Sequence, residues 1–154
     1  DWTGFNVPCH VVRFFRYFFS DKTEKELQLQ KIIWQQVDAF AREQGRMTDG
    51  LRFYVIGTCS RDPDERDTVE HEVHHGLFYC DEVYRDETTK IVRKYKRRCK
   101  PLFDALRAQG YCEGVLEDEA QTYAITGWRT SWEPTCAMKQ MARDLKKVAA
   151  RYRR

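Results

Sequence analysis

The sequence predicts a helix-rich α+β fold in one domain, residues 1–154. Apolar residues recur with helical spacing along most of the chain, whereas only residues 51–57 (LRFYVIG) form a clear strand, rich in β-branched and aromatic residues. The length of 154 residues suits one domain with one core, and no internal repeat or linker divides it. We therefore expect a small sheet packed against several helices.

In the first third of the chain we expect one aromatic surface and one long helix. Residues 11–19 are apolar and aromatic, and we interpret them as core or as a packing surface. Thr23 and Glu26 have the spacing of a capping box, which predicts a helix that continues to about Glu43. Gly45 is a suitable stop for this helix.

The second half of the chain is predicted to be mainly helical. Proline, glycine and acidic residues mark the expected ends of its segments. In order, these segments are a helix over 81–100, a short helix over 101–108, a strand or extended passage over 111–116, a helix starting near 117, a loop over 127–133 and a last helix from 134 to about 152.

Bulk composition excludes little but favours a cytoplasmic setting, with secretion left open. The net charge of +3 is too small to indicate a nucleic-acid or membrane partner, and no apolar run has the length of a membrane span. The six cysteines have wide spacings without a C-x-x-C pair, so we expect reduced thiols rather than disulfides or a zinc ribbon. They are Cys9, Cys59, Cys80, Cys99, Cys112 and Cys136.

The most informative stretch is H-E-V-H-H at residues 71–75, which has the pattern H-E-x-x-H. On a helix, residues four apart share a face, so His71 and His75 can bind one metal ion. Glu72 then lies beside that ion, where a carboxylate can accept a proton from metal-bound water. We expect the helix to begin near Thr68 with Asp67 as its N-cap. The alternative is that these are surface histidines of an ordinary amphipathic helix.

A hydrolytic zinc site needs a third protein ligand and one position for water. Asp81 would point away from His75 on a continuing helix, and Glu82 would lie about 10 Å further along the axis. Asp118 and Glu119 on a later helix remain, and we choose Glu119 because a hydroxyl and a phenol follow it on the same face. Alternatively, both acids only stabilise a helix N-terminus.

These motifs resemble the gluzincin group of the zincin metallopeptidases, which combine H-E-x-x-H with a glutamate on a later helix. A wider resemblance, over about half of the chain, is to small uncharacterised microbial and phage proteins. Those proteins carry I-G at the end of a strand, then H-E-x-x-H-x-L-F-Y, then D-E-x-x-x-Y. The matching segments here are 56–57, 71–79 and 118–123.

The zincin resemblance implies a minimal helix-rich domain with a small twisted sheet packed on the H-E-x-x-H helix, one zinc ion and hydrolysis of peptide bonds. By the same resemblance His71, His75 and Glu119 are the ligands and Glu72 is the general base. One departure is that many gluzincins have an aspartate four residues after the ligand glutamate, where this chain has Tyr123.

An oxyanion donor is also required for amide hydrolysis. Our candidates are Tyr123 first, His74 second and Arg129 third. His74 points about 100° around the helix from His75, so we expect it to be partly exposed or bonded to a neighbouring acid rather than to bind metal.

Two other functions remain open. The chain can be a non-catalytic zincin-like module that binds nucleic acid or protein through the basic residues of 94–100 and the C-terminal arginines. It can also hold a purely structural zinc ion. Of the possible partners we favour a peptide or protein substrate, expect no membrane, and leave the oligomeric state open.

Overall fold

The computed structural model describes residues 4–58, 64–128 and 132–152. Within them the chain forms seven α-helices and a two-stranded antiparallel sheet, so the helix-rich α+β class is confirmed. The elements are β1 (Gly4–Pro8), α1 (Cys9–Phe18), α2 (Glu24–Glu43), β2 (Tyr54–Thr58), α3 (Glu65–Cys80), α4 (Glu82–Tyr95), α5 (Lys100–Ala108), α6 (Leu116–Thr126) and α7 (Cys136–Ala149), with short 3₁₀ helices at Thr48–Gly50 and Glu113–Val115.

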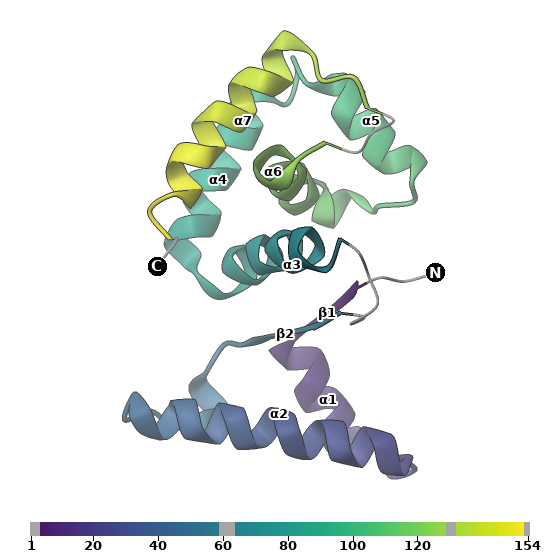
Figure 1. Ribbon diagram of the computed structural model, residues 1–154, viewed down its shortest axis with the longest axis vertical. Helices are drawn as coiled ribbons and strands as arrows, with labels where there is room; N and C mark the ends of the chain where they lie inside the picture. Colours follow the sequence, from purple (N-terminus) through teal and green to yellow (C-terminus); the bar gives the residue numbers. More distant parts are fainter. Residues whose placement is uncertain (1–3, 59–63, 129–131, 153–154) are drawn as a thin grey trace.

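The sheet is the middle layer of the molecule. Figure 1 shows it between the α1–α2 pair on one side and α3 on the other, with α4 to α7 beyond α3. β1 pairs with β2 so that Asn6 lies opposite Ile56. The strand predicted over 51–57 exists but runs from Tyr54 to Thr58. The strand or extended passage expected over 111–116 is not formed: Glu113–Val115 is a 3₁₀ helix and α6 begins at Leu116, while β2 pairs with the N-terminal strand β1.

Two apolar clusters stabilise the fold where one core was expected. The larger lies among α4 to α7, where Leu106, Met141 and Leu145 are fully buried. The smaller joins α1, α2 and β2 around Trp34 and Val37. α3 contacts the sheet on one side and α6 on the other, so it connects the two clusters. The metal-motif helix is therefore held from both sides.

The aromatic run of α1 is not part of either cluster. Val12 is buried, but Phe14 is 54% exposed, Tyr17 64% and Phe18 72%. The rings of Phe14 and Phe18 stack on one another, with centroids 4.7 Å apart. Of these residues the core interpretation therefore holds for Val12 alone, whereas Phe14, Tyr17 and Phe18 form an exposed aromatic surface.

Local sequence signals set several helix ends as predicted. The α2 capping box is present: Glu26 N–H donates to Thr23 Oγ1, and Glu26 Oε2 accepts from Thr23 N–H. Gly45 follows this helix with a φ of +60°, which glycine adopts without strain.

The helices near prolines end differently from our expectation. The helix over 81–100 stops at Tyr95, because a continuing helix would bring the ring of Pro101 against the carbonyl of Arg97. Pro101 instead occupies the first turn of α5. The last helix begins at Cys136 rather than at Pro134, since the Thr135 hydroxyl accepts from Met138 N–H and is the N-cap.

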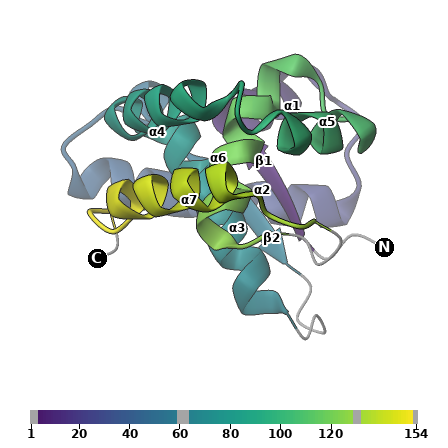
Figure 2. The ribbon, with the colours of Figure 1, turned by 90° about the horizontal axis from the view of Figure 1, so that it is seen from above.

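α4 and α7 run side by side in opposite directions, as Figure 2 shows. Lys94 near the end of α4 pairs with Asp144 on α7, while Glu87, two turns earlier, pairs with Arg151 just after α7. None of the described helices is long and apolar enough to cross a bilayer. The five cysteines in the described ranges carry free thiols, and Cys59 lies outside those ranges.

Candidate metal centre

α3 carries the H-E-x-x-H residues, but it starts earlier than predicted. The Asp64 carbonyl accepts from Thr68 N–H, so the first turn opens at Glu65; Asp67 lies within that turn and is not the N-cap. The helix ends at Cys80, and Asp81 follows in an extended conformation; the Asp81 carboxylate accepts from Tyr84 N–H at 2.8 Å and caps α4. The expectation that the helix continues through Asp81 is therefore wrong; Asp81 instead caps α4 and is not part of the group formed by His71, His75 and Glu119.

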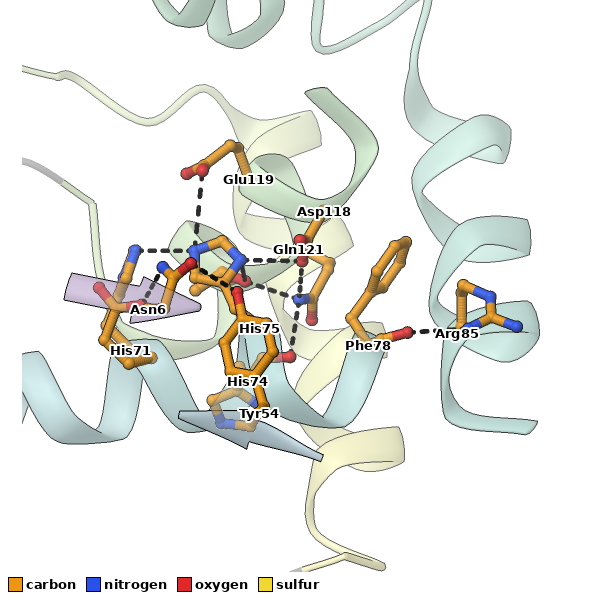
Figure 3. Close-up of polar contacts among 12 residues, drawn as sticks. Asn6, Tyr54, His71, His74, His75, Phe78, Arg85, Asp118, Glu119 and Gln121 are labelled. Carbon is orange, nitrogen blue, oxygen red and sulfur yellow. Dashed lines mark hydrogen bonds and ion pairs between the residues drawn. The ribbon is translucent and has the colours of Figure 1, made fainter. Parts of the chain in front are cut away.

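α6 brings Glu119 to the two histidines of α3. One ligand atom from each of His71, His75 and Glu119 lies within 4.8 Å of the others, and within the described ranges these three form the one such His/Cys/Asp/Glu group. The two Nε2 atoms are 3.3 Å apart, and Glu119 Oε1 is 3.7 Å from His75 Nε2 (Figure 3). The structure therefore brings together all three predicted ligands.

The spacing fits one metal ion. Two imidazole nitrogens bound tetrahedrally at about 2.0–2.1 Å from zinc are separated by about 3.3–3.4 Å, which matches the 3.3 Å between the Nε2 atoms of His71 and His75. His75 is buried, whereas His71 and Glu119 are of intermediate burial, and the Glu119 side chain is 13% exposed. Two imidazoles and one carboxylate are a three-ligand donor set of the kind found in catalytic zinc sites, whereas structural sites have four protein ligands.

The other ring nitrogens are held so that both Nε2 atoms carry lone pairs. The hydroxyl hydrogen of Thr126 is donated to the Thr122 carbonyl, so its oxygen accepts from His71 Nδ1–H at 3.2 Å. His75 Nδ1 lies 2.9 Å from Asp118 Oδ1, an acceptor when ionised. Two lone pairs 3.3 Å apart repel, so a cation or a proton is needed between them. Contacts of this kind orient metal-binding histidines.

The pKa of His75 reflects the negative charges around this centre. Burial lowers the pKa of His75, but the hydrogen bond and charge of Asp118, followed by the charges of Glu119 and Glu72, outweigh burial and raise it. In the metal-free protein a proton on His75 can therefore take the place of the ion. Metal and proton compete for this group.

The sheet orients the predicted general base. Asn6 of β1 donates from Nδ2 to Glu72 Oε2, and Tyr54 of β2 donates its hydroxyl to Asn6 Oδ1 at 2.7 Å (Figure 3). Burial and the charges of Asp118, Glu72 and Glu119 raise the pKa of Tyr54, so its phenol stays protonated and can donate. Gly76 gives the Tyr54 ring room, since a Cβ there would lie 3.3 Å from its Cδ1.

Of the three predicted oxyanion donors, one borders the site, one is buried away from it and one is not described by the structure. The Tyr123 ring packs edge-on against the His71 ring, with centroids 4.8 Å apart, so it borders the site. The expectation that His74 is partly exposed is wrong: it is 3% exposed, and its Nδ1 bonds the Tyr84 hydroxyl of α4 at 2.8 Å. Because His74 is buried on the core side of α3, it is not available to donate to an oxyanion. Arg129 lies outside the described residues.

Four residues at the site were missed by the sequence reasoning or given another role. Asn6 gave no signal because β1 was not predicted, and Tyr54 was assigned only to a strand. Asp118 was considered as a ligand but instead holds His75 Nδ1, and Thr126 was overlooked although it is one turn after Thr122.

Comparison of the chain with protein-family models, curated proteins and solved structures finds no match. The relation to zincins therefore stays a prediction that depends on the two motifs and on the convergence of His71, His75 and Glu119.

Proposed function

We propose that the protein is a zinc-dependent hydrolase that cleaves amide bonds in peptides, with one zinc ion held by His71, His75 and Glu119. The observation that supports this most is the approach of the two Nε2 atoms to 3.3 Å beside the Glu119 carboxylate. Bound zinc supplies Lewis acidity, which lowers the pKa of a water to about 7 and polarises a carbonyl.

The chain's own groups perform the remaining tasks. Glu72 accepts the proton of the attacking water and delivers it to the leaving amine, a role that needs a carboxylate beside the ligands. Asn6, fixed by Tyr54, orients Glu72 for this transfer. Tyr123 borders the site and is our candidate for donating to the developing oxyanion, whereas the Tyr54 hydroxyl is already engaged with Asn6.

Elemental analysis of exhaustively dialysed protein tests the metal. We expect about one zinc per chain in the wild type, loss in His71→Ala and weaker retention in Glu119→Ala. Absence of metal, without uptake on adding zinc, would overturn the proposal. Iron in place of zinc would also overturn it, because two histidines and one carboxylate with open positions are the ligands of non-haem Fe(II) oxygenases.

Glu72→Gln separates catalysis from a structural metal site. We expect this variant to keep its zinc and to lose cleavage of a fluorogenic peptide library. Glu70→Gln is the matched control, because Glu70 lies on the same helix but lines the groove on its other side, together with His74. A library cleaved equally by the wild type and Glu72→Gln would refute the role of Glu72.

A nucleic-acid-binding module is the second candidate, favoured by an uneven charge distribution. Residues 90–100 contain seven basic residues and no acid, and residues 139–151 contain five with Asp144 as the one acid. Lys94 and Lys147 both lower the pKa of Asp144, after the Tyr95 hydrogen bond, so the two runs meet at the α4–α7 seam. Eight exposed cations make no ion pair with described residues: Lys90, Lys96, Arg97, Arg98, Lys139, Arg143, Lys146 and Lys147.

Fluorescence anisotropy with labelled DNA and RNA tests this candidate. Affinity that falls steeply with salt, is lowered by charge reversal at Lys146 and Lys147, and is unchanged by a chelator would favour the module. If charge reversal at Lys146 and Lys147 leaves the affinity for DNA and RNA unchanged, this basic surface is not the nucleic-acid-binding site.

A further inference from the structure

We infer that Tyr84 and Gln121 are positioning residues of the metal centre, acting through a buried hydrogen-bond chain that connects the neighbouring histidines His74 and His75. This inference rests on the proposed metal site and extends it to two residues that touch neither metal nor substrate. Both side chains are fully buried, Tyr84 on α4 and Gln121 on α6.

The direction of each hydrogen bond in this chain is determined. The Tyr84 hydroxyl donates its hydrogen to Gln121 Oε1 at 2.9 Å. A hydroxyl has one hydrogen, so Tyr84 must accept from His74, and His74 carries its proton on Nδ1, 2.8 Å away. Gln121 Nε2 then donates to Asp118 Oδ1 at 3.1 Å, and the same oxygen accepts from His75 Nδ1.

The orientation of the Gln121 amide is equally constrained. Its Nε2 faces three acceptors: Asp118 Oδ1, the Thr122 hydroxyl oxygen at 2.6 Å and the His74 carbonyl at 3.4 Å. A rotated amide would place Oε1 against a carboxylate and a carbonyl and would leave Tyr84 without an acceptor. In a buried environment such unsatisfied groups are costly, so the network adopts one arrangement.

This arrangement sets which nitrogen of His75 can bind metal. With Asp118 held by Gln121, its Oδ1 stays directed at His75 Nδ1, the proton remains there, and the Nε2 lone pair faces His71 and Glu119. If the chain is broken, Asp118 gains rotational freedom and the other tautomer of His75, which cannot bind through Nε2, becomes accessible. His74 is the far end of this chain.

Zinc affinity, measured by competition with a chromophoric chelator, tests the inference. We expect Tyr84→Phe to weaken zinc binding by about tenfold, the lower end of the range for outer-shell partners. Tyr95→Phe is the matched control: Tyr95 is also buried on α4, but its hydroxyl bonds Asp144 at 2.8 Å, on the α7 side. We expect Tyr95→Phe to bind zinc like the wild type. Equal affinity in all three proteins, or equal loss in both variants, would overturn the inference.

The ¹⁵N shifts of the His75 ring in metal-free protein give a second readout that does not need the proposed function. In alkaline buffer we expect the Nδ1–H tautomer in the wild type and a shift towards a tautomer mixture in Gln121→Met, which keeps the side-chain length but removes the hydrogen bonds of the amide, including those to Tyr84 and Asp118. If the wild type binds no zinc, the proposed function fails, and these shifts still decide the role of the network. Unchanged His75 shifts in folded Gln121→Met would refute it.

Discussion

Replacing Asp118 by asparagine should weaken the metal centre without removing a ligand. The His75 Nδ1–Asp118 Oδ1 contact of 2.9 Å involves an imidazole whose side chain is 5% exposed. A hydrogen bond to a charged group contributes about 1.5–3 kcal/mol. At about 1.4 kcal/mol per factor of ten, Asp118→Asn should lower zinc affinity by about 10–100-fold, the range found for outer-shell carboxylates.

The same substitution should change the pH dependence in a defined direction. The folded-state pKa of His75 is raised, so the stability contributed by its ion pair is fully present below the unfolded pKa of about 6.5 and is lost as pH rises through the folded value. Zinc needs neutral His75, so wild-type affinity falls as pH drops through that raised pKa. In Asp118→Asn this fall should begin at lower pH.

Isothermal titration of zinc across a pH series measures both effects. Glu117→Gln is the matched control, since Glu117 precedes Asp118 on α6 but its carboxylate pairs with Arg93. We expect the control to follow the wild-type curve. An Asp118→Asn protein with wild-type affinity and wild-type pH profile would refute the assignment of Asp118 as the residue that holds His75.

Three further outcomes are expected. Asn6→Ala should keep its zinc but lose about tenfold or more in peptide hydrolysis, because Glu72 loses its orienting donor; an equal loss of zinc would instead indicate a structural role. Zinc at about 100 times its dissociation constant should raise the free energy of unfolding by about 2.7 kcal/mol, and a chelator should reverse this in a thermal melt. Leu145→Ala should cost about 2–5 kcal/mol in urea unfolding, because this leucine is fully buried among α4 to α7; a cost below 1 kcal/mol would contradict that packing.

The parts of the site that the sequence predicts are those set by local geometry and simple chemistry. The four-residue spacing of His71 and His75 determines their common face on any helix, whatever surrounds it. The third ligand required a long-range inference, but a carboxylate with a following hydroxyl and phenol on one helical face pointed to Glu119. Helix ends were predictable where a capping box or glycine acts within a few residues, as at Thr23 and Gly45.

The parts that were missed depend on contacts between distant segments. β1 is only five residues long, and its partner lies about fifty residues later, so the pairing of Asn6 with Ile56 has no local signal. Helical spacing showed that His74 points away from His75, but only the packing of α4 places Tyr84 opposite it. The roles of Asp118 and Glu119, adjacent on α6, were distinguishable only by which ring nitrogen each one faces.

The residues of the proposed centre come from two separately packed parts of the molecule, α6 on one side of α3 and the sheet on the other. α6, supported by the larger apolar cluster, provides Glu119 and the groups that fix both histidine rings. The sheet, supported by the smaller cluster, provides the residues that orient Glu72. Damage to the smaller cluster should therefore reduce catalysis before it reduces metal binding, whereas damage to the larger cluster should reduce both together. This expected difference follows from α3 lying between two separately packed layers.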